Sequence, residues 1–161
     1  MSQAATAIDA TTRQTLGCEL AAEVLRSTGR LCLRATGASM LPAIWPGDVL
    51  LVSRHGVEKT LPGDIILCYR QGKLVAHRVV QRTLSQNRIQ WVTRGDSTEG
   101  SDAPVSSQEL LGRVTAIVRG SRRLSPRRSL AGRLASGVLC RSNLATRALL
   151  WLGKPFFGVR D

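Results

Sequence analysis

The sequence predicts a mainly β domain with one N-terminal helix before it and a basic helical segment after it. Between residues 30 and 120, short apolar runs alternate with turns rich in glycine and proline, which is typical of short strands. Residues 11–28 instead repeat their apolar side chains at helical spacing. Residues 121–161 hold 9 Lys/Arg against 1 Asp/Glu, whereas residues 1–120 hold 14 against 10. The chain therefore divides into a disordered N-terminus (1–10), a β domain with its leading helix (11–120) and a basic amphipathic segment (121–161).

Each expected element has a local signal. Leu16, Leu20 and Val24 lie at helical spacing, and Gly29 ends the helix. Apolar runs between turn residues predict the strands, which cover residues 30–36, 49–52, 65–82 (a hairpin that turns near Gln71 and Gly72), 89–93 and 113–120.

Composition argues against several classes of protein. No apolar run reaches the roughly 18 residues that a membrane span requires. The first residues lack the basic and apolar regions of a secretory signal, so we expect a cytoplasmic protein or one peripheral to the cytoplasmic membrane. The four cysteines are spaced like neither a metal site nor a disulfide framework and are expected to be buried thiols: Cys18, Cys32, Cys68 and Cys140. We therefore expect neither a metal nor a cofactor.

Two residues are candidates for chemistry on and near the strands. Ser39 lies in the stretch GASMLPAIWPGDVLLV (37–52), which is either a turn before a core strand or a loop that holds the serine beside the sheet. His77 shares a strand face with Val75 and Val79, and a poorly hydrated neutral imidazole can act as a general base. The alternative is a structural histidine bonded to a carbonyl group.

Two acids share the loop after the strand at 89–93. A carboxylate of Asp96 or Asp102 could reach His77 and orient it, as serine hydrolases require of their third group. Alternatively, Asp96 is a turn residue of the Arg-Gly-Asp corner, and Asp102 is held before the Ala-Pro pair. The residues alone leave both readings open.

The order of five short blocks resembles that of the signal peptidase I superfamily, over about residues 31–120. The blocks are Gly-Ala-Ser-Met-Leu-Pro (37–42), Gly-Asp-Val (47–49), Gly-Asp-Ile (63–65), His-Arg-Val-Val (77–80) and Arg-Gly-Asp (94–96), the last with Asp102 behind it. The His-Arg block resembles the histidine-base type of the endoplasmic reticulum and archaea. Bacterial housekeeping members and the self-cleaving SOS repressors use a lysine as base instead.

This resemblance implies a serine endopeptidase that cleaves after small residues through an acyl-enzyme. Ser39 would be the nucleophile, His77 the general base and Asp102 the orienting acid, while Asp96 would support the loop or share that role. Lys73 is a less favoured alternative base, because it lies next to the hairpin turn. Gly37 offers no hydroxyl for the oxyanion, which leaves backbone donors such as the Ser39 amide.

The partner implied by the resemblance is a protein or peptide substrate. Before the serine block, where relatives carry a membrane anchor, residues 11–28 are too polar to span a membrane. The basic segment 121–161 has two interpretations: it contacts an anionic membrane surface, or its apolar residues pack on the domain and leave the arginines in water. The alternative is a self-cleaving or nucleic-acid-binding regulator that uses the domain for sensing or dimerisation. Nucleic acid is less favoured, because no helix-turn-helix precedes the serine block.

Overall fold

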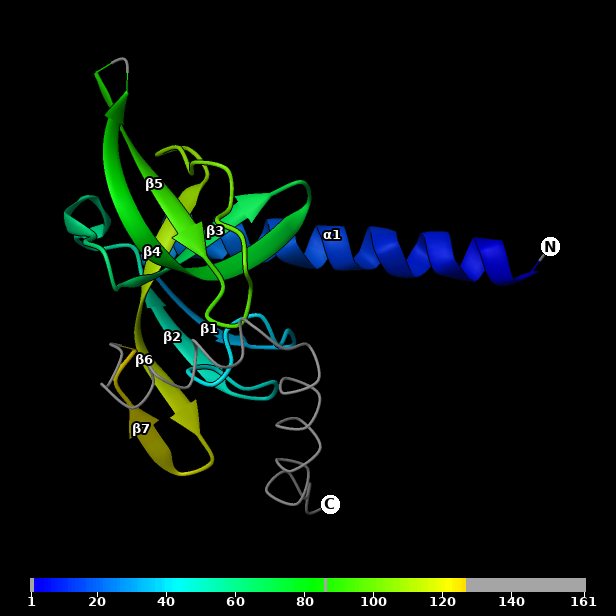
Figure 1. The fold of residues 1–161 in the computed structure, drawn as a ribbon. Coiled ribbons are helices and arrows are strands. Elements are labelled where there is room, and N and C mark those ends of the chain that lie inside the picture. The colour runs from blue at the N-terminus through cyan, green and yellow to red at the C-terminus, as the bar shows by residue number, and fades with distance from the viewer. Residues whose placement is uncertain (1, 86, 127–161) are drawn as a thin grey trace.

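The structure is a computed structural model that describes residues 2–85 and 87–126, with side chains from residue 12 on. Its elements in chain order are α1 (Ser2–Thr28), β1 (Arg30–Arg34), β2 (Val49–Ser53), the 3₁₀ helix η1 (Val57–Lys59), β3 (Ile65–Arg70), β4 (Lys73–Ser85), β5 (Arg88–Arg94), β6 (Leu110–Arg119) and β7 (Arg122–Leu124). The strands form one antiparallel sheet in the order β1-β2-β6-β3-β4-β5, and β7 pairs with β6. The predicted mainly β class with a leading helix is confirmed (Figure 1).

Strand β3 lies at the centre of the fold and has apolar clusters on both of its faces. Ile65 and Leu67 belong to the cluster that packs under α1. Ile66 and Cys68 belong to the second cluster, with Trp91 of β5. A strand that is buried on both faces reads as a continuous apolar run, which is why the sequence Ile-Ile-Leu-Cys shows no alternation.

The hairpin between β3 and β4 fixes the register of the site. Gln71 and Gly72 both have positive φ, 49° and 75°, as in the two-residue turns that suit the twist of antiparallel strands. The turn pairs Arg70 with Lys73 and, four pairs further on, Ile66 with His77. The hairpin therefore turns where the sequence predicts.

Helix α1 differs from its prediction at its start and in its buried face. It begins at Ser2, ahead of the predicted start at residue 11; the added segment is rich in alanine, the best helix former, and contains no proline or glycine. Ala22 and Leu25 pack on the sheet, whereas the side chains of Leu16 and Leu20 are 58% and 67% exposed. The N-terminal part of α1 projects away from the sheet (Figure 1). In the part of the chain that the structure describes, no helix has the length and apolarity of a membrane span.

The boundary between the β domain and the C-terminal segment also differs from the prediction. Residues 122–124 form β7 on β6, where a helical segment was expected to begin at Ser121. Gly120, with a φ of 56°, turns the chain back so that Arg122 pairs with Arg119. The remainder of the predicted basic helical segment, with its expected membrane contact, lies outside the described residues.

The cysteines are not uniformly buried, which corrects another prediction. Cys32 is exposed because its side chain lies on the outer face of the end strand β1, and Cys18 is half-buried on α1. Cys68 is buried, and this burial raises the pKa of its thiol to about 12, so the thiol is protonated at neutral pH. Cys140 lies outside the described residues.

Candidate active site

The loop between β1 and β2 carries Ser39 on an apolar base. Met40, Leu41 and Ile44 are buried below it, in keeping with the Met-Leu-Pro-Ala-Ile sequence. From the other side, the amide of Ser97 donates to the carbonyl of Ser39 over 2.9 Å. The serine backbone is therefore held between the core and the loop that follows β5.

Asp48 anchors the far end of the same loop. Its buried carboxylate accepts hydrogen bonds from the Trp45 amide at 2.8 Å and from Arg119 Nε and NH2 at 2.9 and 2.7 Å. The guanidinium of Arg119 also lies 5.6 Å from the centre of the Trp45 ring. The Pro-Gly-Asp turn is thereby tied to β6.

Gly95 makes the close approach of the two loops possible. A Cβ at this position would lie 2.6 Å from the Ser39 carbonyl oxygen and 2.8 Å from Thr98 Oγ1. We expect Gly95→Ala to displace Ser39 and to lower kcat about 100-fold, since misplacement by about 1 Å can have that effect. Steady-state kinetics on the folded variant measures this, with Gly100→Ala as the matched control because nothing lies within 4 Å of a Cβ there. Equal kcat values for the two variants would contradict the expectation.

His77 joins the serine to one of the two candidate acids. Its Nε2 lies 3.0 Å from Ser39 Oγ, and its Nδ1 lies 2.6 Å from Asp102 Oδ2. An ionised carboxylate can only accept, so Nδ1 carries the proton and the Nε2 of a neutral imidazole accepts from the serine hydroxyl. The histidine side chain is only 12% exposed. Ser39, His77 and Asp102 are thus brought into one hydrogen-bonded chain.

Thr93 supports the acid and was not anticipated from the sequence. Its hydroxyl donates to Asp102 Oδ2 over 2.6 Å, and its carbonyl accepts from the Asp102 amide over 2.7 Å. Thr93 is buried on β5. The sequence feature that could have indicated Thr93 is its place at the end of an apolar strand, directly before the loop that contains both acids.

Asp96 has a different partner on the opposite face of β4. Arg78 donates to it in bidentate geometry, from Nε to Oδ1 at 2.9 Å and from NH2 to Oδ2 at 2.7 Å. The two side chains are 3% and 1% exposed. Arg78 NH1 also donates to the carbonyls of Gly63 and Pro126. Successive residues of a strand face opposite sides, so His77 faces Ser39 while Arg78 faces Asp96.

A groove of about 520 Å³ opens beside Ser39 and His77. Two of its walls are consecutive segments of chain, residues 33–37 at the end of β1 and residues 73–77 of β4, and α1 contributes Gln14 and Cys18. Four apolar side chains complete the lining: Met40, Ile44, Leu50 and Leu67. β4 pairs with β3 from Lys73 on but with β5 only from Arg78 on, so its other edge pairs with no described strand over residues 73–77. Lys73 itself lies at the turn end of this wall.

The fold and this cluster define a peptidase-like β domain. The sequence matches the family described as Peptidase S24-like over residues 2–115, and the chain belongs to that family. It is also similar to the signal peptidase complex catalytic subunit SEC11 of Colletotrichum graminicola, with 31% identity over 74 residues. This match covers 44% of the chain and 43% of the relative, so the chain spans less than half of the relative's length. The resemblance to the signal peptidase I superfamily is confirmed, and the family supports the function of a peptidase or of a related regulator.

Proposed function

We propose that the protein is a serine endopeptidase that hydrolyses a peptide bond through an acyl-enzyme on Ser39. The observation that carries this proposal is the pair of hydrogen bonds of His77, from Nε2 to Ser39 Oγ at 3.0 Å and from Nδ1 to Asp102 at 2.6 Å. A nucleophile, its base and the group that orients the base are in hydrogen-bond contact without any further movement.

The reaction has two halves that use the same imidazole. His77 Nε2 takes the proton of Ser39 as Oγ attacks the carbonyl carbon, and Asp102 stabilises the imidazolium that forms. The imidazolium then gives its proton to the leaving amine, the C–N bond breaks and the acyl group stays on Oγ. A water molecule next loses a proton to His77 and attacks the ester carbonyl carbon. The bond between this carbon and Oγ then breaks, the carboxylic acid leaves, and the imidazolium proton restores the Ser39 hydroxyl.

The oxyanion of each tetrahedral intermediate requires hydrogen-bond donors. Among the described residues, the amide of Ser39 has no hydrogen-bond acceptor, which leaves it available for this purpose. Gly37 contributes no side chain. The proposed oxyanion hole therefore relies on the backbone of the serine loop.

The groove supports a peptide substrate in extended conformation. An extended chain can pair with the free edge of β4 over residues 73–77, as peptides do when they add a strand to a sheet. The apolar lining from Met40, Ile44 and Leu67 favours uncharged substrate side chains. The resemblance to signal peptidases adds a preference for small residues before the cleaved bond, so the proposed partner is a protein or peptide with such a site.

Labelling with a fluorophosphonate probe tests the activated nucleophile. Peptide mapping of the wild type is expected to locate the adduct on Ser39, and Ser39→Ala and His77→Ala are both expected to abolish it. Ser101→Ala is the matched control, because this exposed serine lies in the neighbouring loop and outside the cluster. Labelling of His77→Ala at the wild-type rate would overturn the proposal, as would the absence of both labelling and peptide cleavage.

Self-cleavage is the second candidate, because the family also supports a related regulator. Cleavage within one molecule has a rate constant that does not depend on protein concentration. Cleavage of a separate substrate molecule becomes faster as the protein concentration rises. Intact-mass time courses at several protein concentrations separate the two, with Ser39→Ala as the control.

A further inference from the structure

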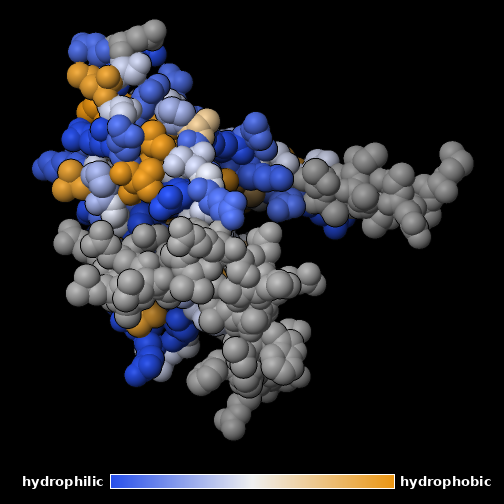
Figure 2. Space-filling model, viewed as in Figure 1, coloured by the Kyte–Doolittle hydropathy of each residue, from blue (hydrophilic) through white to orange (hydrophobic). Residues whose placement is uncertain are grey.

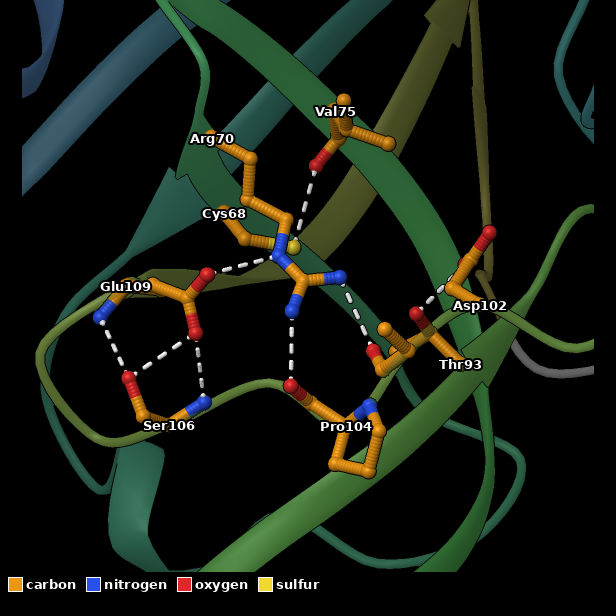
Figure 3. Close-up of polar contacts among 9 residues, drawn as sticks. Cys68, Arg70, Val75, Thr93, Asp102, Pro104, Ser106 and Glu109 are labelled. Atoms are coloured by element: carbon orange, nitrogen blue, oxygen red, sulfur yellow. Dashed lines mark hydrogen bonds and ion pairs between the residues drawn. The ribbon is translucent and has the colours of Figure 1, made fainter.

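We propose that Arg70 is a positioning residue that holds Asp102 in place on His77. This inference rests on the proposed function, since it concerns the same site. Arg70 ends β3, far from Asp102 in sequence, yet its guanidinium binds the two residues that directly follow the acid (Figure 3).

The guanidinium of Arg70 uses all three of its nitrogens. NH1 donates to the carbonyl of Ala103 at 2.8 Å, NH2 donates to the carbonyl of Pro104 at 2.6 Å, and Nε donates to Glu109 Oε1 at 2.7 Å. A planar fork with five N–H groups can bind acceptors on two sides at once, which the single ammonium group of lysine cannot do in this geometry. Two successive carbonyls are thus fixed against one rigid group.

Glu109 fixes the guanidinium in turn. While its Oε1 accepts from Arg70, its Oε2 accepts from both the amide and the hydroxyl of Ser106 at 2.9 Å. Burial raises the pKa of the Glu109 carboxyl, but the hydrogen bonds from Arg70 and Ser106 outweigh it and leave the pKa below its ordinary value. The carboxylate is therefore ionised at neutral pH and links the Arg70 guanidinium to Ser106.

The segment after Asp102 is attached to β5 only at its ends. The Asp102 amide donates to Thr93, and Val105 exchanges backbone hydrogen bonds with Trp91. Between these attachments, the backbone carbonyls of Ala103 and Pro104 bind Arg70 instead. Within the described part of the chain, Arg70 is the only side chain that hydrogen-bonds to Ala103 and Pro104, so its loss leaves these two residues without a side-chain anchor. We infer that Asp102 then moves relative to His77.

Arg70 acts through Asp102 and not on the substrate. It does not line the groove beside Ser39, whereas Lys73 and the rest of the β4 wall do. Ala103 and Pro104 are exposed, so water can take over their carbonyl hydrogen bonds when the guanidinium is removed. The fold is therefore expected to survive the loss of Arg70, although the site is not.

The kinetic test compares Arg70→Met with Arg113→Met. Arg113 lies on β6 in an ion pair with Asp64 at 3.5 Å. In the described part of the chain its side chain does not hydrogen-bond to residues 102–109, so Arg113→Met is a matched loss of one guanidinium. Arg70→Met is expected to lower kcat 10- to 100-fold with KM changed less than twofold, and Arg113→Met is expected to change neither. Arg70→Lys is expected to restore less than half of the lost activity, because a point charge replaces the fork. Equal kcat for the two methionine variants, or full rescue by lysine, would overturn the proposal.

A spectroscopic test works without any substrate. The chain contains only two histidines, so a His55→Gln background leaves the imidazole signals of His77 alone. In this background, the Nδ1 proton bound to Asp102 is expected to give a downfield NMR signal that Arg70→Met broadens or removes and Arg113→Met retains. An unchanged signal in Arg70→Met would refute the positioning role. If Arg70→Met does not fold, Glu109→Gln, which removes the counter-ion of Arg70, takes its place in both tests.

The two tests separate failure of this inference from failure of the proposed function. If the protein neither reacts with the fluorophosphonate probe nor cleaves a peptide, the proposed peptidase function fails. If the Nδ1 signal is nevertheless lost in Arg70→Met, the positioning role of Arg70 stands. If Ser39 is labelled but Arg70→Met changes neither kcat nor the Nδ1 signal, the peptidase function stands and the positioning role fails.

Discussion

Asp102→Asn is expected to lower kcat on the order of 10⁴-fold, as loss of the orienting acid does in serine peptidases. The asparagine amide can donate to His77 Nδ1, which places the imidazole proton on Nε2. That nitrogen can then no longer accept the proton of Ser39, although the two atoms lie 3.0 Å apart. Cleavage of a peptide with small residues before the scissile bond measures the effect.

The control for this prediction is a double variant. His77→Ala and Asp102→Asn act on one hydrogen-bonded chain, so the double variant is expected to be no slower than His77→Ala alone. Multiplying losses would mean that the two side chains act independently. A kcat of Asp102→Asn within tenfold of the wild type would contradict the assigned role.

Asp96→Asn is expected to lower the free energy of unfolding by about 3–5 kcal/mol, the effect of breaking a buried ion pair. The guanidinium of Arg78 is 3% exposed and would remain in the interior without a counter-charge. Urea unfolding at neutral pH measures the loss. Asp64→Asn is the matched control, with an expected loss of about 1 kcal/mol or less, because its partner Arg113 is 34% exposed at 3.5 Å.

A second variant separates the charge from the shape of the side chains. Adding Arg78→Met to Asp96→Asn removes the unpaired charge, so part of the lost stability is expected to return. Similar losses for Asp96→Asn and Asp64→Asn would indicate that the Arg78 pair is solvated. The two acids of the loop are thus expected to affect different quantities, Asp102 the rate and Asp96 the stability.

The sequence was sufficient where the signal is local. The turn at Gln71 and Gly72 and the alternation around His77 predict both the hairpin and the face on which the histidine lies. Of the two interpretations of residues 37–52, the family resemblance favours the loop beside the sheet, and the structure has this loop with Met40 and Ile44 buried. These features depend on contacts within a few residues.

The choice between the two acids could not be made from local signals. It depends on the register of β4 against β5, which contains an irregularity between Val79 and Gln81. Such a bulge changes which side of the following loop faces the histidine. The roles of Arg70 and Thr93 were missed for a related reason, since each reaches Asp102 or its neighbours only through the paired sheet.

The start of helix α1 and the short strand β7 were not predicted. Helix α1 begins at Ser2, because a helix that is already packed on the sheet at Leu25 can extend through an alanine-rich segment without new nucleation. Strand β7 was missed because its three residues, Arg122–Leu124, carry no apolar alternation long enough to recognise.

The short turn at Gln71 and Gly72 links the register of β4 to the stability of the fold. Inserting one residue there would shift β4 by one position against β3 and turn every side chain of the strand to the other face. Ala76 would then take the place of His77 beside Ser39, and His77 would take the place of Arg78 beside Asp96. The same slip that disables the serine also breaks the buried ion pair, so a molecule in the wrong register is the less stable one. Stability and the arrangement of the site therefore depend on the same register, so the stable folded molecules are those with His77 beside Ser39.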